Sequence, residues 1–317
     1  MVPYTKGLHE IADGVWAWLA PDGSWGWSNA GLVEGDGRTL LVDTLFDLKL
    51  TGEMLDAMAP IMRRSALSDV VNTHANGDHC YGNQLLPQGV RIHAAPEVAE
   101  EMHETPAALL AQLTSSDLGP VLTPFIRKCF GPFDFDGIIM REPNTPVHGS
   151  TTVSLGERRI DLVTLGPAHT NGDIVAHVID AGVVFAGDLL FISGTPIMWA
   201  GPVENWIAAC DTMISWNPHV VVPGHGPVTD VDGIREVRDY FTHVDRQVRA
   251  AYQAGKDWKQ AAWEIDLDRF AGLGDAERIV VTTHQMYRKL DPDMPGLDVG
   301  QLFLHMAEWQ LARGPSS

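Results

Sequence analysis

The sequence predicts an α/β fold in which two β-sheets pack face to face and helices cover their outer faces. Two observations support this prediction. Short strand-like runs come in pairs around glycine-containing turns, and a segment with apolar residues at helical spacing follows them. The same plan then appears a second time further along the chain, although the sequence itself does not repeat. Two such halves, each with an apolar sheet face to bury, favour a layered sandwich.

In the first half, the expected strands are short, apolar and separated by turn residues such as Asp13-Gly14 and Gly35-Asp36-Gly37. These strands cover residues 7–19 (a hairpin), 29–34, 39–42 and 69–71. Apolar residues at helical spacing predict a helix over 48–58 that ends near Pro60. In the second half, the expected strands cover residues 151–155, 159–165, 174–179, 183–186 and 220–222. A second helix is expected over 203–216.

Two regions fall outside this plan, and they leave residues 1–231 as the expected catalytic core. The first is an insertion over about 96–146, with helices expected over 96–102 and 107–113 and irregular chain after them. We expect this insertion to form a lid over the functional site described below, and the alternative is a peripheral helical pair. The second is a mostly helical extension over 232–317, expected to pack on the core. Two alternatives stay open for the extension: it lines a substrate pocket, or it forms a dimer contact.

Residues 72–79 (Asn-Thr-His-Ala-Asn-Gly-Asp-His) carry the strongest functional signal in the chain. They place His74, Asp78 and His79 within six residues, directly after an apolar strand-like run. Packing does not explain imidazole and carboxylate groups crowded at this spacing, whereas a divalent cation uses both as ligands. The segment therefore predicts part of a metal site.

Three further residues of ligand type stand at the ends of later strand-like runs. They are His169, Asp188 and His225, and each lies beside or near a glycine. At such a junction the strand aims the side chain, and the glycine lets backbone and ligand approach closely. Four strand ends that carry ligand-type side chains predict one converging site.

In their order along the chain, these residues resemble the motifs of the metallo-β-lactamase superfamily of metallohydrolases, over roughly residues 8–230. The family motif His-x-His-x-Asp-His is matched by His74-x-Asn76-x-Asp78-His79. The resemblance implies a four-layer αββα sandwich and an enzyme that attacks its substrate with a metal-bound hydroxide. It implies that Asp78 is the catalytic residue that orients the nucleophile. The implied ligands are His74, residue 76 and His169 for a first metal, Asp78, His79 and His225 for a second, and Asp188 as the bridge.

Asn76 departs from the family motif, because it stands where the family has its second histidine. A neutral amide oxygen is a weaker zinc ligand than imidazole, so the first metal position is expected to be weakened. Three outcomes stay open. The protein holds two zinc ions of unequal affinity, or one zinc in the second position, or iron bound by two histidines and one carboxylate (His74, His169 and Asp188).

The composition and net charge of the chain limit the classes of binding partner that we expect. The chain has 317 residues, with 22 Lys and Arg against 41 Asp and Glu, a formal net charge of −19. Nucleic acid and anionic membrane surfaces are disfavoured as partners, because both demand positive charge. No apolar run approaches the ~18 residues of a membrane span, and the first residues lack the apolar core of a signal peptide. With only three cysteines, a cytoplasmic location is expected. The expected partner is a small-molecule substrate, and a homodimer is left open.

Tryptophans flank the expected site. Trp25 and Trp27 lie between small residues in a loop that overhangs the active site in the family, and Trp199 lies in a loop after Asp188. These rings are candidates for the wall of an apolar substrate pocket. Ordinary packing is the alternative for the pair in the first loop.

The expected function is zinc-dependent hydrolysis of an ester, thioester or lactone-type small molecule. The alternatives are a polyketide-type cyclase or thioesterase on the same metal site, iron-dependent oxygen chemistry, and a non-catalytic binding module. The binding module is disfavoured, because Asp78 and Asp188 would then be buried without a cation to offset their charge.

Overall fold

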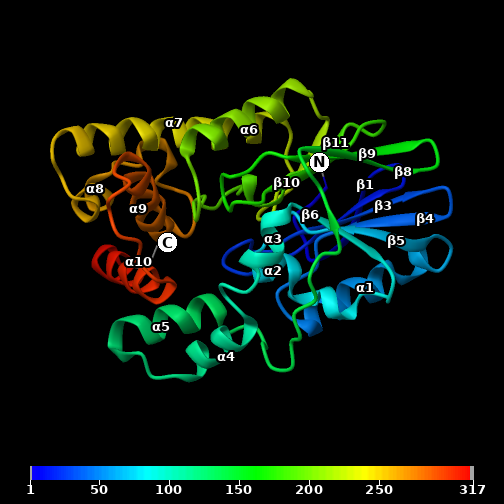
Figure 1. The fold of residues 1–317 in the computed structure, drawn as a ribbon, viewed down its shortest axis with the longest axis horizontal. Coiled ribbons are helices and arrows are strands. Elements are labelled where there is room, and N and C mark those ends of the chain that lie inside the picture. The colour runs from blue at the N-terminus through cyan, green and yellow to red at the C-terminus, as the bar shows by residue number, and fades with distance from the viewer. Residues whose placement is uncertain (1, 315–317) are drawn as a thin grey trace.

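The computed structural model describes residues 2–314, which form two β-sheets packed face to face with helices outside them (Figure 1). This arrangement confirms the predicted α/β sandwich. The first sheet has the strand order β1 (Gly7–Ala12), β2 (Val15–Leu19), β3 (Ala30–Gly35), β4 (Arg38–Val42), β5 (Ala66–Val71), β6 (Arg91–Ala94) and β7 (Thr145–Pro146). The second sheet has the order β12 (Val220–Val222), β11 (Val183–Phe185), β10 (Ile174–Val178), β9 (Arg158–Thr164) and β8 (Ser150–Leu155).

Helices lie outside the sheets and at one end of the sandwich (Figure 1). They are α1 (Leu48–Met62), α2 (Gly77–Cys80), α3 (Pro96–Glu101), α4 (Ala107–Ser115), α5 (Gly119–Phe130), α6 (Val203–Ser215), α7 (Val231–Gln253), α8 (Trp258–Glu264), α9 (Ile279–Leu290) and α10 (Val299–Arg313). Short 3₁₀ turns separate some of them, including η4 (Ala276–Arg278) directly before α9. Within residues 2–314, no helix combines the length and the apolar character needed to cross a membrane.

Strand β4 shows how the alternation of side chains builds two cores. Leu40 and Val42 point into the core between the two sheets. Leu41 points to the opposite face, where it joins Met54 and Met58 of α1 in a second buried cluster. Both faces of this strand are therefore buried, which makes it a rigid base for the residue that follows it.

Parallel pairing brings the ends of the ligand-bearing strands together. In the first sheet β4 pairs with β5 so that Val42 lies opposite Val71. In the second sheet β11 pairs with β12 so that Phe185 lies opposite Val222. The carboxyl ends of paired parallel strands meet at one edge of a sheet. The segments that carry the predicted ligands therefore leave the two sheets at neighbouring positions.

Two helix predictions are wrong, and proline explains both. Helix α1 continues to Met62, because Pro60 lies in the last turns, where a missing N–H removes only one helical bond. The chain at 119–130, predicted to be irregular, forms α5. Pro120 occupies the first turn of α5, where proline is tolerated, and apolar residues at helical spacing fill the buried face.

The insertion and the extension meet at one end of the sandwich. Helix α10 packs against α5, and the two lie next to each other at the lower left of Figure 1. Helix α7 packs along α6, and α8 and α9 connect α7 to α10. The last residues of the predicted insertion pair with β6 as strand β7. The domain boundaries at 96–146 and 231 stay predictions.

Candidate metal centre

The 72–79 segment folds so that its two histidines meet. Residues 72–76 leave β5 as a loop, and α2 then carries Asp78 and His79 back toward His74. The buried Asn72 side chain donates to the His79 carbonyl at 3.0 Å and closes the loop. The rings of His74 and His79 lie 4.4 Å apart, centroid to centroid. The short spacing in the sequence thus becomes a pair of adjacent imidazoles.

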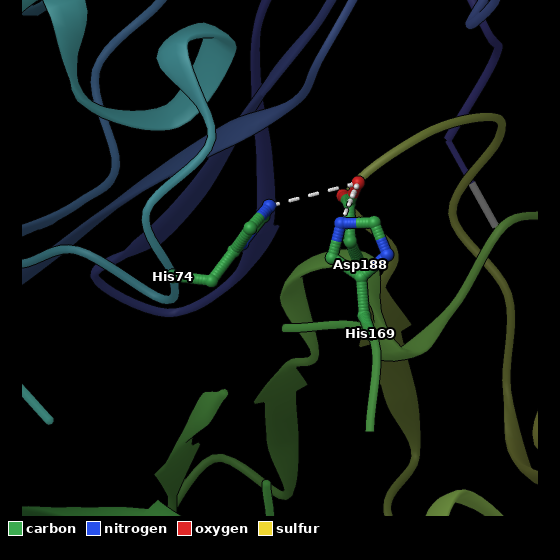
Figure 2. A group of neighbouring side chains, drawn as sticks. All are labelled: His74, His169 and Asp188. Atoms are coloured by element: carbon green, nitrogen blue, oxygen red, sulfur yellow. Dashed lines mark ion pairs between the residues drawn. The ribbon is translucent and has the colours of Figure 1, made fainter. Parts of the chain in front are cut away.

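The first group of ligand-type side chains is His74, His169 and Asp188, all buried. Figure 2 shows both histidines pointing at the Asp188 carboxylate from separate segments of the chain. The Nε2 atom of His169 lies 3.4 Å from Asp188 Oδ2, and that of His74 lies 3.7 Å from it. One candidate ligand atom from each residue falls within 4.8 Å of the other two.

The second group is Asp78, His79 and His225, also buried and also within 4.8 Å. The Nε2 atom of His225 lies 3.2 Å from Asp78 Oδ2. Asp188 reaches this group too, with Oδ1 at 3.1 Å from His79 Nε2 and Oδ2 at 3.5 Å from His225 Nε2. The carboxylate of Asp188 thus stands between the two groups, in the position that the sequence predicts for a bridge.

The donor atoms of these groups fit a cation. The Nε2 atoms of His74, His79 and His169 are buried and make no hydrogen bond with any residue in 2–314. Buried polar atoms are rarely left in this state, so three of them around one carboxylate call for a ligand. Imidazole and carboxylate together suit a divalent transition ion. Asn76 is half-buried and its side chain does not cap the helix that follows it.

Hydrogen bonds behind the histidines hold these rings in place. Asp43 accepts from His79 Nδ1 at 2.9 Å, from the Thr73 N–H at 2.7 Å and from the Thr73 hydroxyl at 2.8 Å. The Thr73 oxygen lies 3.0 Å from His74 Nδ1, and His169 Nδ1 donates to the Ile197 carbonyl at 2.7 Å. Such partners fix the ring orientation and leave Nε2 free for an ion.

Asp43, directly after β4, is the hydrogen-bond partner of the ligand His79. Its backbone has φ of 61°, a left-handed conformation that is uncommon for residues other than glycine. Thr170, next to the ligand His169, donates its hydroxyl to Asp173 at 2.8 Å. Thr73 contacts the His74 ring and the Ile197 carbonyl accepts from the His169 ring, whereas Nδ1 of His225 is buried and makes no hydrogen bond with any residue in 2–314. Neither Thr73 nor Ile197 carries a motif that would identify it from the sequence.

The charges of the two groups are strongly coupled. Burial, together with the neighbouring imidazoles, lowers the pKa of His74 well below its usual value. Burial opposes a charge on His225 as well, but Asp188 and Asp78 raise the pKa of His225 to about 9. Burial also opposes ionisation of Asp188, yet His225, His79 and His74 hold the pKa of this carboxyl well below its usual value. The carboxylate is therefore ionised and ready to bind a cation.

Gly224 allows the closest approach in the centre. A Cβ at this position would lie 1.9 Å from Asp188 Oδ1 and 2.8 Å from the Gly187 carbonyl carbon. Only glycine therefore lets the loop that carries His225 pass beside Asp188.

Above the ligand groups lies a cavity of about 660 Å³, a size typical of small-molecule sites. Asp78, His169, Asp188 and His225 lie in its wall. The remaining wall combines polar and apolar side chains, and its apolar part includes Trp25, Phe46, Leu110, Phe130, Phe191, Ile197, Trp199, Leu302 and Phe303. The candidate metal centre therefore opens into a pocket suited to an apolar group.

Both regions outside the sandwich contribute to this cavity. The insertion supplies residues from Glu101 to Phe130, and the extension supplies residues from Arg278 to Phe303. Phe303 is at the junction, with its ring 5.8 Å from Trp25 and 5.4 Å from Phe130. The insertion thus forms part of the cavity wall, and its role as a lid stays a prediction.

Of the three tryptophans predicted for the wall, two line the cavity. Trp25 and Trp199 are in the wall. Trp27 is not among the lining residues, and its ring packs 4.9 Å from Phe133 instead. Trp25 is drawn inward because its indole N–H donates to the buried Glu277 carboxylate at 3.1 Å.

Comparisons with known proteins agree with this geometry. The family model described as the metallo-beta-lactamase superfamily matches residues 23–225. The chain is 24% identical over 213 residues to the human protein named acyl-coenzyme A thioesterase MBLAC2, which covers 62% of this chain and 72% of that one. It is 23% identical over 207 residues to metallo-beta-lactamase type 2 of Bacillus cereus, covering 63% of this chain and 68% of the enzyme.

Solved structures share the fold at low sequence identity. The sec-alkylsulfatase Pisa1 from Pseudomonas sp. has a TM-score of 0.67 and 15% identity, over 92% of this chain. This chain spans only about half of the sulfatase, 52% of its length. The metallo-beta-lactamase from Pontibacter korlensis has a TM-score of 0.55 and 18% identity, over 75% of this chain and 99% of that one. With the family model covering most of its length, the chain belongs to the metallo-beta-lactamase superfamily and is a metal-binding hydrolase of that fold.

Proposed function

We propose that this enzyme is a zinc-dependent hydrolase of acyl thioesters. The observation that carries the proposal is the position of the two ligand groups, joined at Asp188, in the wall of a cavity that also has a continuous set of aromatic and aliphatic lining residues. An acyl chain would lie among the aromatic side chains, with its carbonyl at the ligand groups. A human relative that is named for acyl-coenzyme A thioesterase activity supports this choice of substrate.

Zinc is the proposed ion because imidazoles dominate both ligand groups. The second group (Asp78, His79 and His225) would fill first. The first group would bind more weakly, because Asn76 offers only an amide oxygen where the family has an imidazole. A divalent ion in these groups supplies an activated water and polarises the carbonyl of the substrate.

The chain's own side chains orient the reaction. Asp78 faces the cavity, and its Oδ2 atom is within hydrogen-bond reach of His225 Nε2, at 3.2 Å. Its carboxylate is placed to hold the proton that an attacking water loses. Asp43 keeps the neighbouring His79 ring fixed from behind. The aromatic wall excludes bulk water from the acyl chain.

The leaving group favours a thioester over an ordinary ester. Tyr81 lines the cavity, but its hydroxyl donates to the Thr105 carbonyl, and burial raises its pKa far above the usual value. It is therefore a poor proton donor. A thiol leaves readily as the thiolate, because its pKa is only about 8.5. Thioester cleavage thus needs no dedicated acid, whereas release of an alkoxide does.

The test is release of free thiol from acyl-coenzyme A substrates of increasing chain length, beside lactones, aryl esters and a β-lactam. Thioesters should be turned over fastest, a chelator should abolish the activity, and added zinc should restore it. Asp78→Ala should lower kcat at least a hundredfold, the low end for a positioned proton acceptor. Faster turnover of the lactone or the β-lactam than of any thioester would overturn the proposed substrate.

A further inference from the structure

Polar and cationic side chains from η4 and α9 face the cavity. The lining residues there are Arg278, Gln285, Arg288 and Lys289. Within α9 the spacing from Gln285 is three and four residues, which places these side chains on one helix face. The rest of the wall combines aromatic and aliphatic side chains with carboxylates and other polar groups. The cavity therefore has a cationic edge in a chain of net charge −19.

The inner end of this edge is neutralised. Arg278 is buried, and its guanidinium pairs with Asp275 at 3.1 Å. The guanidinium also lies 4.5 Å from the ring of Trp25 and 5.2 Å from that of Phe191. Phe191 stacks on the ligand His225, with ring centroids 5.1 Å apart. Arg278 thus marks the metal end of the cavity, and its charge is already offset.

The outer end of the edge carries two available charges. Arg288 and Lys289 are exposed, and neither forms an ion pair with any residue between 2 and 314. The Arg288 guanidinium donates to the Gln285 side-chain oxygen at 3.3 Å, which orients it along the wall. The rim formed by the insertion carries Glu101 and Glu104, and Asp298, the residue directly before α10, also lines the cavity. An anionic group at the mouth would be repelled from the rim formed by the insertion and attracted to α9.

Arg278 and the pair Arg288 and Lys289 lie far enough apart to contact different parts of one substrate. Lys289 follows Arg278 by eleven positions, which is about 16 Å along the helix axis at a rise of 1.5 Å per residue. A substrate that fills the cavity between them must carry its anionic group well away from the scissile bond. The pantetheine arm of coenzyme A separates the thioester from the phosphates with an uncharged linker of comparable reach.

Building on the proposed thioester hydrolysis, we propose that Arg288 and Lys289 form a phosphate subsite. This subsite holds the phosphates of a coenzyme A thioester at the mouth while the acyl carbonyl lies at the metal centre. Gln285 lines the path between the two, where the amides of the arm need polar partners.

The position of the two cations has a competing explanation. Basic residues in the last turn of a helix stabilise its dipole, and Arg288 and Lys289 are in the last turn of α9. The chain contains a matched case in Arg127 and Lys128, an adjacent exposed pair in the last turn of α5. Neither residue of this second pair lines the cavity. Replacing Arg127 and Lys128 therefore removes two charges from a helix end without changing the cavity wall. Replacing Arg288 and Lys289 does both.

The test compares R288Q/K289Q with R127Q/K128Q in the zinc-loaded full chain. Three substrates share one acyl group, namely acyl-coenzyme A, acyl-4′-phosphopantetheine and acyl-pantetheine. In R288Q/K289Q the preference for acyl-coenzyme A over acyl-pantetheine should fall at least tenfold, through KM and not through kcat. R127Q/K128Q should keep the wild-type preference. The intermediate substrate shows whether the phosphate next to the arm or the more distant one is held.

A binding measurement separates this inference from the proposed function. Calorimetry with coenzyme A itself reports the subsite without any hydrolysis. The subsite is supported if the wild type binds coenzyme A and R288Q/K289Q binds it at least tenfold more weakly. This result would hold even if no thioester is cleaved and the proposed function fails. Thioester hydrolysis with the same substrate preference and the same coenzyme A affinity in both double variants would overturn the subsite and leave the proposed function standing.

Discussion

Replacement of Asp43 by asparagine tests whether the hydrogen bonds behind the histidines prepare the metal centre. Asp43 accepts three hydrogen bonds, one from His79 Nδ1 and two from Thr73. Asparagine has the same shape but only one acceptor oxygen, so His79 and Thr73 must compete for it. Substitutions of such partners typically cost 10–100-fold in metal affinity. We therefore expect Asp43→Asn to weaken zinc binding by about 1.4–2.8 kcal/mol, at 1.4 kcal/mol for each factor of ten.

The assay is competition for zinc with a chromophoric chelator, after circular dichroism has shown that the variant is folded. Asp69→Asn is the matched control, because Asp69 is another buried carboxylate that pairs with a histidine, His93 Nε2 at 2.7 Å. His93 belongs to neither ligand group, so the control should lower stability and leave zinc affinity unchanged. Wild-type zinc affinity in folded Asp43→Asn, or an equal loss in the control, would refute the reasoning.

Three other substitutions probe the first metal position, the cavity wall and a buried histidine. Asn76→His should tighten binding of the weaker zinc equivalent at least tenfold in a metal titration, and unchanged stoichiometry and affinity would contradict the weak-ligand account. Phe303→Ala should lower the free energy of unfolding in urea by about 3–5 kcal/mol and shift the preference toward longer acyl chains, whereas an unchanged chain-length profile would argue against an acyl pocket there. Burial lowers the pKa of His284 to about 4, so at pH 5 the unfolded chain takes up a proton that the folded ring does not. This group should therefore cost about 2 kcal/mol of stability between pH 7 and pH 5, and His284→Phe should remove that part of the pH dependence; equal slopes in both proteins would contradict it.

The ligand positions were predictable because each is encoded locally. A short apolar strand followed by glycine and an imidazole or carboxylate identifies a strand end, and parallel pairing of β4 with β5 and of β11 with β12 brings such ends together. Asp43 follows the same logic, because it comes directly after β4. These signals are confined to a few residues and do not depend on distant packing.

The cavity wall was not predictable in the same way. Phe303 and Arg278 reach the pocket only because α10 packs on α5 and because η4 lies against Trp25. Nothing in the sequence near either residue specifies that contact. The two tryptophans of the first loop look equivalent in sequence, and only the Glu277 carboxylate, far along the chain, draws Trp25 inward. Helix α5 was missed for another reason, since two prolines in the first half of the helix hide its apolar spacing.

The most direct test of the central claim is the number of zinc ions bound per chain, measured by elemental analysis after zinc loading and dialysis, in the wild type and in Asp188→Ala. Because Asp188 stands between both ligand groups, its loss should weaken both. We expect the wild type to retain at least one zinc ion, with any second ion bound more weakly, and Asp188→Ala to retain far less. A wild type that keeps no zinc, or an alanine variant that keeps as much as the wild type, would contradict a metal centre built from these six side chains.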